Sequence, residues 1–304
     1  MKKQLLASLG ASMLAVSGAA NAAFLLDDWT LDVTGVDGLV AGDVLGQPHT
    51  VVSGISQMSF LAQGLSVTND TNGDGLPSVG ETFDVFANGR ISDFVDNGGS
   101  SVSPILLNST ASSGAQNGWE MTFTFEVSGA YTALNPGSAE FTHLAAGMAG
   151  TTGELKFYID DITDGSKSAL SAASPQADDG THIATFLIRA GDGGVFSFLT
   201  GDGSDDARFE LDWALPGVFL DKDGDSLTAD GTLIGMSDSN FDSDPDGTGT
   251  PFSLNIGAFN CGNTATNFCF EEDGSFRIPE PGILALLGAG ILGLTLTSRR
   301  RKSA

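Results

Sequence analysis

The sequence predicts an all-β protein, an antiparallel β-sandwich or jelly-roll-like domain, on three observations. Apolar and polar residues alternate with a period of two in many short segments, as in strands with one buried face. The chain has 41 glycines, and clusters of Gly, Asp, Asn and Ser separate these segments and favour turns. No segment between the two ends has a convincing helical period, although residues 139–148 could form a short helix. Short strands joined by such turns favour packed antiparallel sheets.

The clearest predicted strand runs from Trp119 to Val127, where odd positions are apolar and even positions are polar. Residues 209–213 repeat this pattern, so Trp119 and Trp213 are expected in the core, whereas Trp29 is expected to be exposed. Further strands are expected at residues 29–33, 58–61, 65–68, 82–86, 155–159, 183–188, 195–199, 232–235 and 252–256. We interpret residues 23–277 as one domain with a long loop at 100–118.

One loop carries a complete calcium-binding pattern. Asp70 to Glu81 fit D-x-[DN]-x-[DN]-G-x₅-E, with Gly75 at the sharp turn. Ca²⁺ takes six to eight oxygen ligands, so the expected set is Asp70, Asn72, Asp74, the carbonyl of Leu76 and a bidentate Glu81. Pro77 and the strand-like flanks depart from a helix–loop–helix unit. The loop therefore resembles the EF-hand and dockerin type, set between strands and without a sensor function; the alternative is an acidic surface turn.

Two further acidic loops match the pattern only in part. One contains Asp221, Asp223 and Asp225, and the other contains Asp242, Asp244 and Asp246. Neither has the closing glutamate, so each is as well explained by a solvated turn as by a weaker Ca²⁺ site.

The charge of the chain limits its partners. Six of its 13 Lys and Arg and one of its 38 Asp and Glu lie in the terminal segments, which leaves 7 cations against 37 acids between them. Such a surface repels nucleic acid and anionic lipid, so we expect no nucleic-acid partner. Divalent cations such as Ca²⁺ are the expected neutralising partner.

An enzymatic function is not expected. The three histidines have no metal-binding spacing, and no G-x-S-x-G is present. Glu120 and Glu126 share one strand face, but six residues at about 3.3 Å each separate them by roughly 20 Å, whereas glycosidase carboxylates lie about 5–10 Å apart. A catalytic pair of carboxylates from two different strands remains an alternative. Cys261 and Cys269 are the only cysteines and favour a structural disulfide, with a metal pair as the weaker alternative.

Both ends of the chain read as targeting segments. Residues 1–22 combine Lys2 and Lys3, an apolar stretch and a small-residue cleavage site, as in a signal peptide. At the other end, an apolar segment of residues 282–297 separates a proline–glutamate motif from a basic tail. Sixteen residues make a helix of roughly 24 Å, slightly short for a permanent transmembrane span. The motif residues are Pro279, Glu280, Pro281, Arg299, Arg300 and Arg301.

The arrangement over residues 278–304 resembles the PEP-CTERM sorting signal of Gram-negative bacteria. The resemblance implies export by the Sec machinery, transient insertion in the inner membrane, processing by an exosortase, and delivery to the cell surface or extracellular matrix. It also implies an association with extracellular polysaccharide in biofilm or floc formation. The sequence thus predicts an exported, calcium-binding, non-enzymatic surface or matrix protein. The alternatives are a calcium-stabilised carbohydrate-binding module or a polysaccharide-active enzyme.

Overall fold

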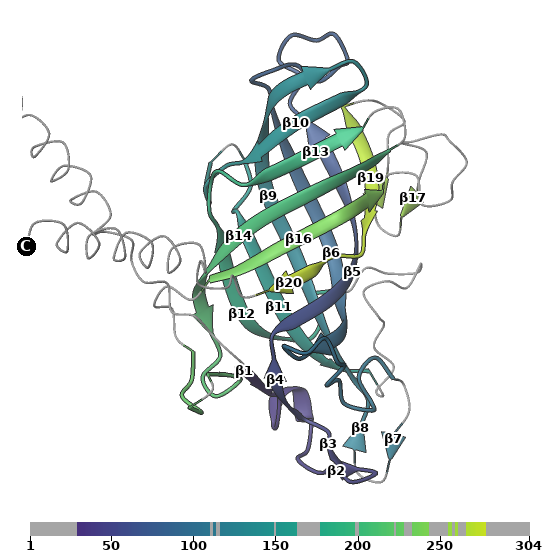
Figure 1. The fold of residues 1–304 in the computed structure, drawn as a ribbon, viewed down its shortest axis with the longest axis vertical. Coiled ribbons are helices and arrows are strands. Elements are labelled where there is room, and N and C mark those ends of the chain that lie inside the picture. Colours follow the sequence, from purple (N-terminus) through teal and green to yellow (C-terminus); the bar gives the residue numbers. More distant parts are fainter. Residues whose placement is uncertain are drawn as a thin grey trace, which may run out of the picture.

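The fold was obtained as a computed structural model (Figure 1). It describes residues 29–109, 112–113, 116–148, 150–162, 177–197, 201–221, 223–227, 233–242, 255–256, 259–260 and 266–277. The predicted signal peptide and the predicted C-terminal apolar helix with its basic tail therefore lie outside the described residues. Among the described residues, no helix is long and apolar enough to cross a membrane.

The described chain is all-β and antiparallel, as predicted. Its only described helical element is the short 3-10 turn η2 (Val36–Gly38). The strands are β1 (Trp29–Asp32), β2 (Asp43–Val44), β3 (Gln47–Pro48), β4 (Val51–Ile55), β5 (Gln57–Thr68), β6 (Thr82–Val95), β7 (Ser112–Ser113), β8 (Gln116–Asn117), β9 (Trp119–Asn135), β10 (Ser138–His143), β11 (Glu154–Asp161), β12 (Thr181–Ile188), β13 (Gly193–Ser197), β14 (Asp202–Ala214), β15 (Phe219–Leu220), β16 (Leu233–Asp242), β17 (Asn255–Ile256), β18 (Phe259–Asn260), β19 (Asn267–Glu272) and β20 (Ser275–Arg277). The expected short helix at 139–148 is wrong, because its first half is β10, paired with β9 and β13.

The large sheet forms two layers that are joined at both edges. Strands β5, β6 and β9 are consecutive neighbours, and they pass behind β13, β14 and β16 in Figure 1. At one end of β9 the pairing continues through β11 and β12 to β14, and at the other end through β10 and β13 to β14. Strand β14 pairs with β16, which returns to β5 through β19 and β20. The circuit of hydrogen-bonded strands is therefore complete.

Aromatic side chains fill the space between the two layers. Phe123 on β9 lies against Phe60, Phe157 and Phe276, with ring centroids 5.3–5.9 Å apart. All four side chains are at most 2 % exposed. The edge-on and tilted ring geometries at these distances are the favourable ones for aromatic pairs.

Three strand glycines make room for these rings. Gly64 is paired with Phe270, Gly89 with Phe123, and Gly129 with Phe83. In each pair, the Cζ atom of the ring lies only 2.2–2.4 Å from the position that a Cβ on the glycine would occupy. The rings thus lie flat across the neighbouring strand, which requires glycine at that position.

Two of the three tryptophans differ from the sequence-based expectation. Trp119 is fully buried, as predicted, but Trp29 is buried at 4 % exposure and Trp213 is 40 % exposed. Trp29 is covered because β1 lies between β4 and β15 in a small separate sheet, where its ring packs on Phe219 at 5.4 Å. Trp213 is turned outward by a β-bulge, described below.

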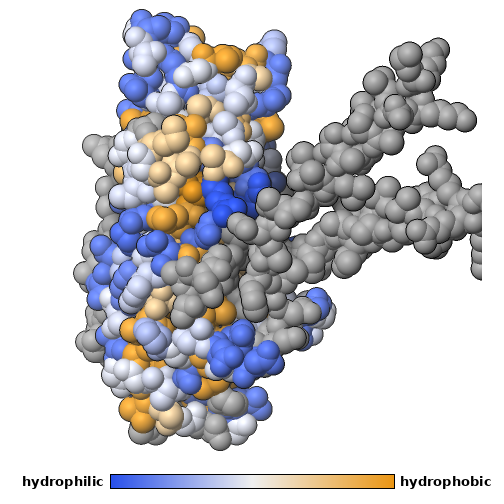
Figure 2. Space-filling view, turned by 90° about the vertical axis from the view of Figure 1, so that its left-hand side faces the viewer, coloured by the Kyte–Doolittle hydropathy of each residue, from blue (hydrophilic) through white to orange (hydrophobic). Residues whose placement is uncertain are grey.

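The described surface exposes few large apolar side chains. Figure 2 shows one side of the molecule, on which hydrophobic residues lie among hydrophilic ones. Ten large apolar side chains are exposed in the described chain, and Trp213 is the one aromatic residue among them.

Candidate functional site

The predicted calcium loop joins β5 to β6. Gly73 and Gly75 have positive φ values of 73° and 76°, which a side chain would disfavour. The two Asp70 carboxylate oxygens accept hydrogen bonds from the amides of these glycines, both at 2.7 Å. Asp70 therefore holds the first half of the loop in a tight turn around its own carboxylate.

Glu81 closes the loop from its other end. Its side chain is buried although the loop residues 71–76 are exposed. One carboxylate oxygen accepts from the amide and the hydroxyl of Thr71 at 2.8 and 3.0 Å, and the other accepts from the amide of Ser78 at 2.9 Å. The last residue of the pattern is thus tied to its second and ninth positions.

The middle of the loop leaves oxygen atoms at the surface. The side-chain oxygen of Asn72 accepts from the Asp74 amide, and a carboxylate oxygen of Asp74 accepts from the Leu76 amide, both at 2.9 Å. Asn72, Asp74 and Leu76 are all exposed. Within the described residues, no three His, Cys, Asp or Glu side chains form a group that could hold a metal ion.

The two partial loops are described less completely. The Asp221 carboxylate accepts from the amides of Asp223 and Asp225 at 2.9 Å, which makes a compact exposed turn. Asp242 ends β16 and is paired with Asp202 and Glu271, while Asp244 and Asp246 lie outside the described residues.

Of the two cysteines, only Cys269 lies in the described part of the chain. Cys269 on β19 is fully buried and disulfide-bonded, and its expected partner Cys261 lies outside the described residues.

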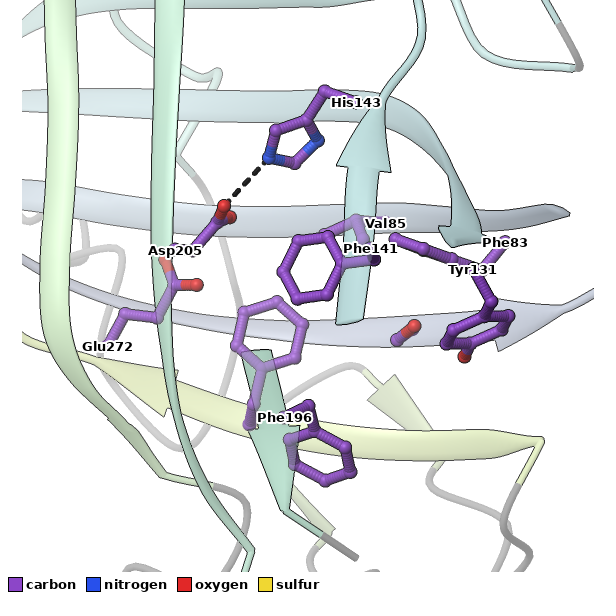
Figure 3. A pocket seen from close by; sticks show the side chains of 10 residues that line it. Phe83, Val85, Tyr131, Phe141, His143, Phe196, Asp205 and Glu272 are labelled. Carbon is purple, nitrogen blue, oxygen red and sulfur yellow. Dashed lines mark hydrogen bonds and ion pairs between the residues drawn. The ribbon is translucent and has the colours of Figure 1, made fainter. Parts of the chain in front are cut away.

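A buried histidine–aspartate pair lines a small internal cavity (Figure 3). His143 Nε2 is 2.8 Å from an oxygen of Asp205, and the two residues are 1 % and 7 % exposed. Phe83, Phe141 and Phe196 form apolar walls of this cavity. Its volume of about 40 Å³ suits bound water rather than an organic ligand. The sequence patterns did not indicate this pair, because its members are 62 residues apart.

Burial and charge act against each other on His143. Burial disfavours the charged imidazolium, but the charge of Asp205, its hydrogen bond and the charge of Asp192 together outweigh it. The pKa of His143 is therefore raised above 6.5. By contrast, burial lowers the pKa of His49, against an opposing hydrogen bond to the carbonyl of Asn117.

Both carboxylates considered for catalysis, Glu120 and Glu126, lie on β9, and each has an acidic residue opposite it on β11. Glu120 on β9 is directly opposite Asp160 on β11, and Glu126 is opposite Glu154. Glu120 and Asp160 are 0 % and 4 % exposed, so this cross-strand pair is inaccessible from the surface.

The comparison with known families concerns the C-terminal end. Residues 277–302 match the family model of the PEP-CTERM protein-sorting motif. No curated protein and no solved structure matches the chain. The motif implies export, membrane anchoring and processing by an exosortase. The chain is therefore a protein with a PEP-CTERM sorting signal.

Proposed function

We propose that the chain is a non-enzymatic, calcium-binding protein of the cell surface or extracellular matrix that associates with extracellular polysaccharide. The sorting motif supports the destination, because it is a signal for export. The loop from Asp70 to Glu81 supports the chemistry, and the observation that carries it is the buried Glu81 carboxylate bound back onto the start of an otherwise exposed acidic loop.

The hydrogen bonds within the loop leave acceptor sites for a cation. A carboxylate has about four lone-pair sites, and each Asp70 oxygen uses one for a loop amide. Asp74 and Asn72 each accept one loop amide and keep further sites on exposed oxygens. With the Leu76 carbonyl and the second Glu81 oxygen, these atoms are hard oxygen donors of the kind that Ca²⁺ prefers. Asp70, Asp74 and Glu81 do not form a metal-binding group in the structure, so a bound cation would have to draw their oxygens together. Such a cation would neutralise part of the negative charge of the protein. The full chain carries a net charge of −25.

One cross-strand carboxylate pair is unsuited to glycosidase chemistry because it is buried. A glycosidase needs two carboxylates on either side of a bound sugar. The cross-strand pair Glu120 and Asp160 is buried beneath the surface, where a polysaccharide cannot reach it.

Thermal unfolding of the purified full-length chain in mild detergent, with Ca²⁺ or EDTA, tests the calcium site. Bound Ca²⁺ at 100 times its Kd stabilises the folded state by about 2.7 kcal/mol, so EDTA is expected to lower Tm by several degrees. The double variant Asp70→Asn with Glu81→Gln, which keeps the size of both side chains, is expected to lose this response.

Asp96→Asn is the matched control, because Asp96 accepts from the amides of Gly98 and Ser100 in an exposed turn outside the pattern. It is expected to keep the response to EDTA. An identical Tm of the wild-type chain in Ca²⁺ and in EDTA would overturn the calcium proposal.

A further inference from the structure

Three aromatic side chains form a continuous row on the outer surface of the sheet. Tyr158 on β11, His182 on β12 and Trp213 on β14 come from consecutive strands. The ring centroids of Tyr158 and His182 are 5.2 Å apart, and those of His182 and Trp213 are 4.8 Å apart, the latter stacked at an interplanar angle of 28°. We refer to these three residues as the aromatic row.

Two β-bulges build the row. On β14, Leu211 pairs with Phe186 and Trp213 with Thr185, so Asp212 is an extra residue that turns Trp213 outward. On β12, Ala184 pairs with Phe157 and His182 with Tyr158, so Ile183 is the extra residue. Without the bulges, the period-two alternation would place Trp213 in the core.

Hydrogen bonds of His182 hold the aromatic row in place, and the Trp213 indole stays partly accessible. His182 Nε2 is 3.0 Å from both the carbonyl oxygen of Ala184 and the hydroxyl of Thr185. Burial lowers the pKa of His182, against an opposing hydrogen bond to Ala184, so the ring stacks in its neutral form at pH 7. One face of the Trp213 indole lies on this imidazole, so the accessible part of the indole is its other face and its edge.

Part of the Trp213 side chain is accessible at the surface. At 40 % exposure, a Trp side chain of roughly 250 Å² leaves about 100 Å² accessible. This area suits one small flat apolar surface.

Charged side chains that donate or accept hydrogen bonds lie near the aromatic row in the sequence of β11 and β14. Lys156, two residues before Tyr158, forms a 2.6 Å ion pair with Glu154, and both side chains are partly exposed. Asp212, next to Trp213, is exposed. An apolar ring surface bordered by donors and acceptors is the combination that fixes a ligand carrying both C–H faces and hydroxyl groups.

We propose that Trp213, supported by His182 and Tyr158, is a stacking platform for a pyranose ring of a neutral polysaccharide. This proposal rests on the proposed export to the cell surface and names the site and class of its glycan. One face of a pyranose presents C–H groups that fit an indole, and its hydroxyls reach the neighbouring Lys156, Glu154 and Asp212. The net charge of −25 disfavours a polyanionic ligand such as nucleic acid.

A second copy of the chain is a poorer fit for this surface. A stable protein interface buries about 800 Å² on each partner, several times the exposed area of Trp213. Two copies also repel each other through their shared negative charge. The aromatic row therefore points to a small repeating unit of a polymer.

Tryptophan fluorescence reports on this site directly. The chain has three tryptophans, of which Trp29 and Trp119 are buried and Trp213 is exposed. Acrylamide therefore quenches mainly Trp213 in the full-length chain. We expect cellohexaose, dextran or galactomannan to reduce this quenching, and native gels containing the neutral polymer to retard the protein.

Substitution of the indole provides the variants. Trp213→Ala is expected to migrate in polysaccharide gels as in plain gels, whereas Trp213→Phe keeps a ring and retains part of the retardation. Leu61→Ala, which trims an exposed apolar side chain on β5, is the matched control and is expected to behave as the wild type. Retardation that persists in Trp213→Ala overturns the proposal, as does a wild-type chain that none of the three neutral glycans protects from acrylamide.

EDTA separates this proposal from the calcium proposal. Stacking on Trp213 requires no cation, so retention by neutral polymers is expected to be the same in EDTA and in Ca²⁺ at a temperature where both forms are folded. A chain whose Tm responds to EDTA but which binds no neutral glycan keeps the calcium site and loses the platform. A chain that binds a neutral glycan through Trp213 but whose Tm is the same in EDTA and in Ca²⁺ keeps the platform and loses the calcium site.

Discussion

The substitution Gly89→Ala tests the packing between the layers. A Cβ at this position would lie 2.2 Å from Cζ and 2.5 Å from Cε1 of Phe123, and 2.8 Å from the carbonyl oxygen of Leu61. Unstrained carbon–carbon contacts are about 3.5–4.0 Å, so the ring would have to retreat by roughly 1.4 Å. Phe123 has no free space to enter, because Phe60, Phe157 and Phe276 surround it.

Overpacking of this kind costs about 1–3 kcal/mol, and we expect the upper half of that range. For a domain of this size, about 2–3 kcal/mol corresponds to a decrease in Tm of roughly 4–12 °C. Urea denaturation followed by circular dichroism measures the free energy of unfolding, provided that the transition is reversible and its m-value is unchanged.

Two comparisons decide whether the ring contact is the cause. Gly98→Ala meets only the flexible Asp96 side chain at 3.2 Å and is expected to change stability by less than about 0.5 kcal/mol. Adding Phe123→Leu to Gly89→Ala removes the clashing ring atom, so the two substitutions together should cost less than the sum of their separate effects. Equal stabilities of Gly89→Ala and Gly98→Ala, or strict additivity with Phe123→Leu, would refute the reasoning.

Two further predictions concern the buried histidine and the cysteines. Because the folded-state pKa of His143 is raised, its pair with Asp205 stabilises the fold fully below pH 6.5 and loses this contribution as the pH rises through the folded pKa. Asp205→Asn is therefore expected to reduce the free energy of unfolding more at pH 5.5 than at pH 9 in urea titrations; an equal loss at both pH values would contradict this. Cys269→Ala is expected to lower stability by about 2.5 kcal/mol, the chain-entropy value for the short loop to Cys261, and dithiothreitol should have the same effect on the wild type but none on the variant.

The fold class followed from local patterns, whereas the closure of the sheet did not. Alternation in β9 and β14 identified strands, and the Gly and Asp clusters identified the turns between them. The return of β16 to β5 through β19 and β20 pairs residues about 200–220 positions apart, and no local pattern specifies such pairing. The paired glycines and phenylalanines are equally non-local, because each ring covers a glycine of another strand.

The candidate sites divide in the same way. By itself, the sequence determined the acidic loop from Asp70 to Glu81 and the C-terminal sorting motif, because both are contiguous patterns with fixed spacing. Only the tertiary structure decided the aromatic row and the His143–Asp205 pair, since their members come from different strands. A period-two pattern assigns Trp213 to the core, and a single extra residue in β14 reverses that assignment. The physical reason is that one inserted residue exchanges the two faces of a strand, and only its pairing partner reveals the insertion.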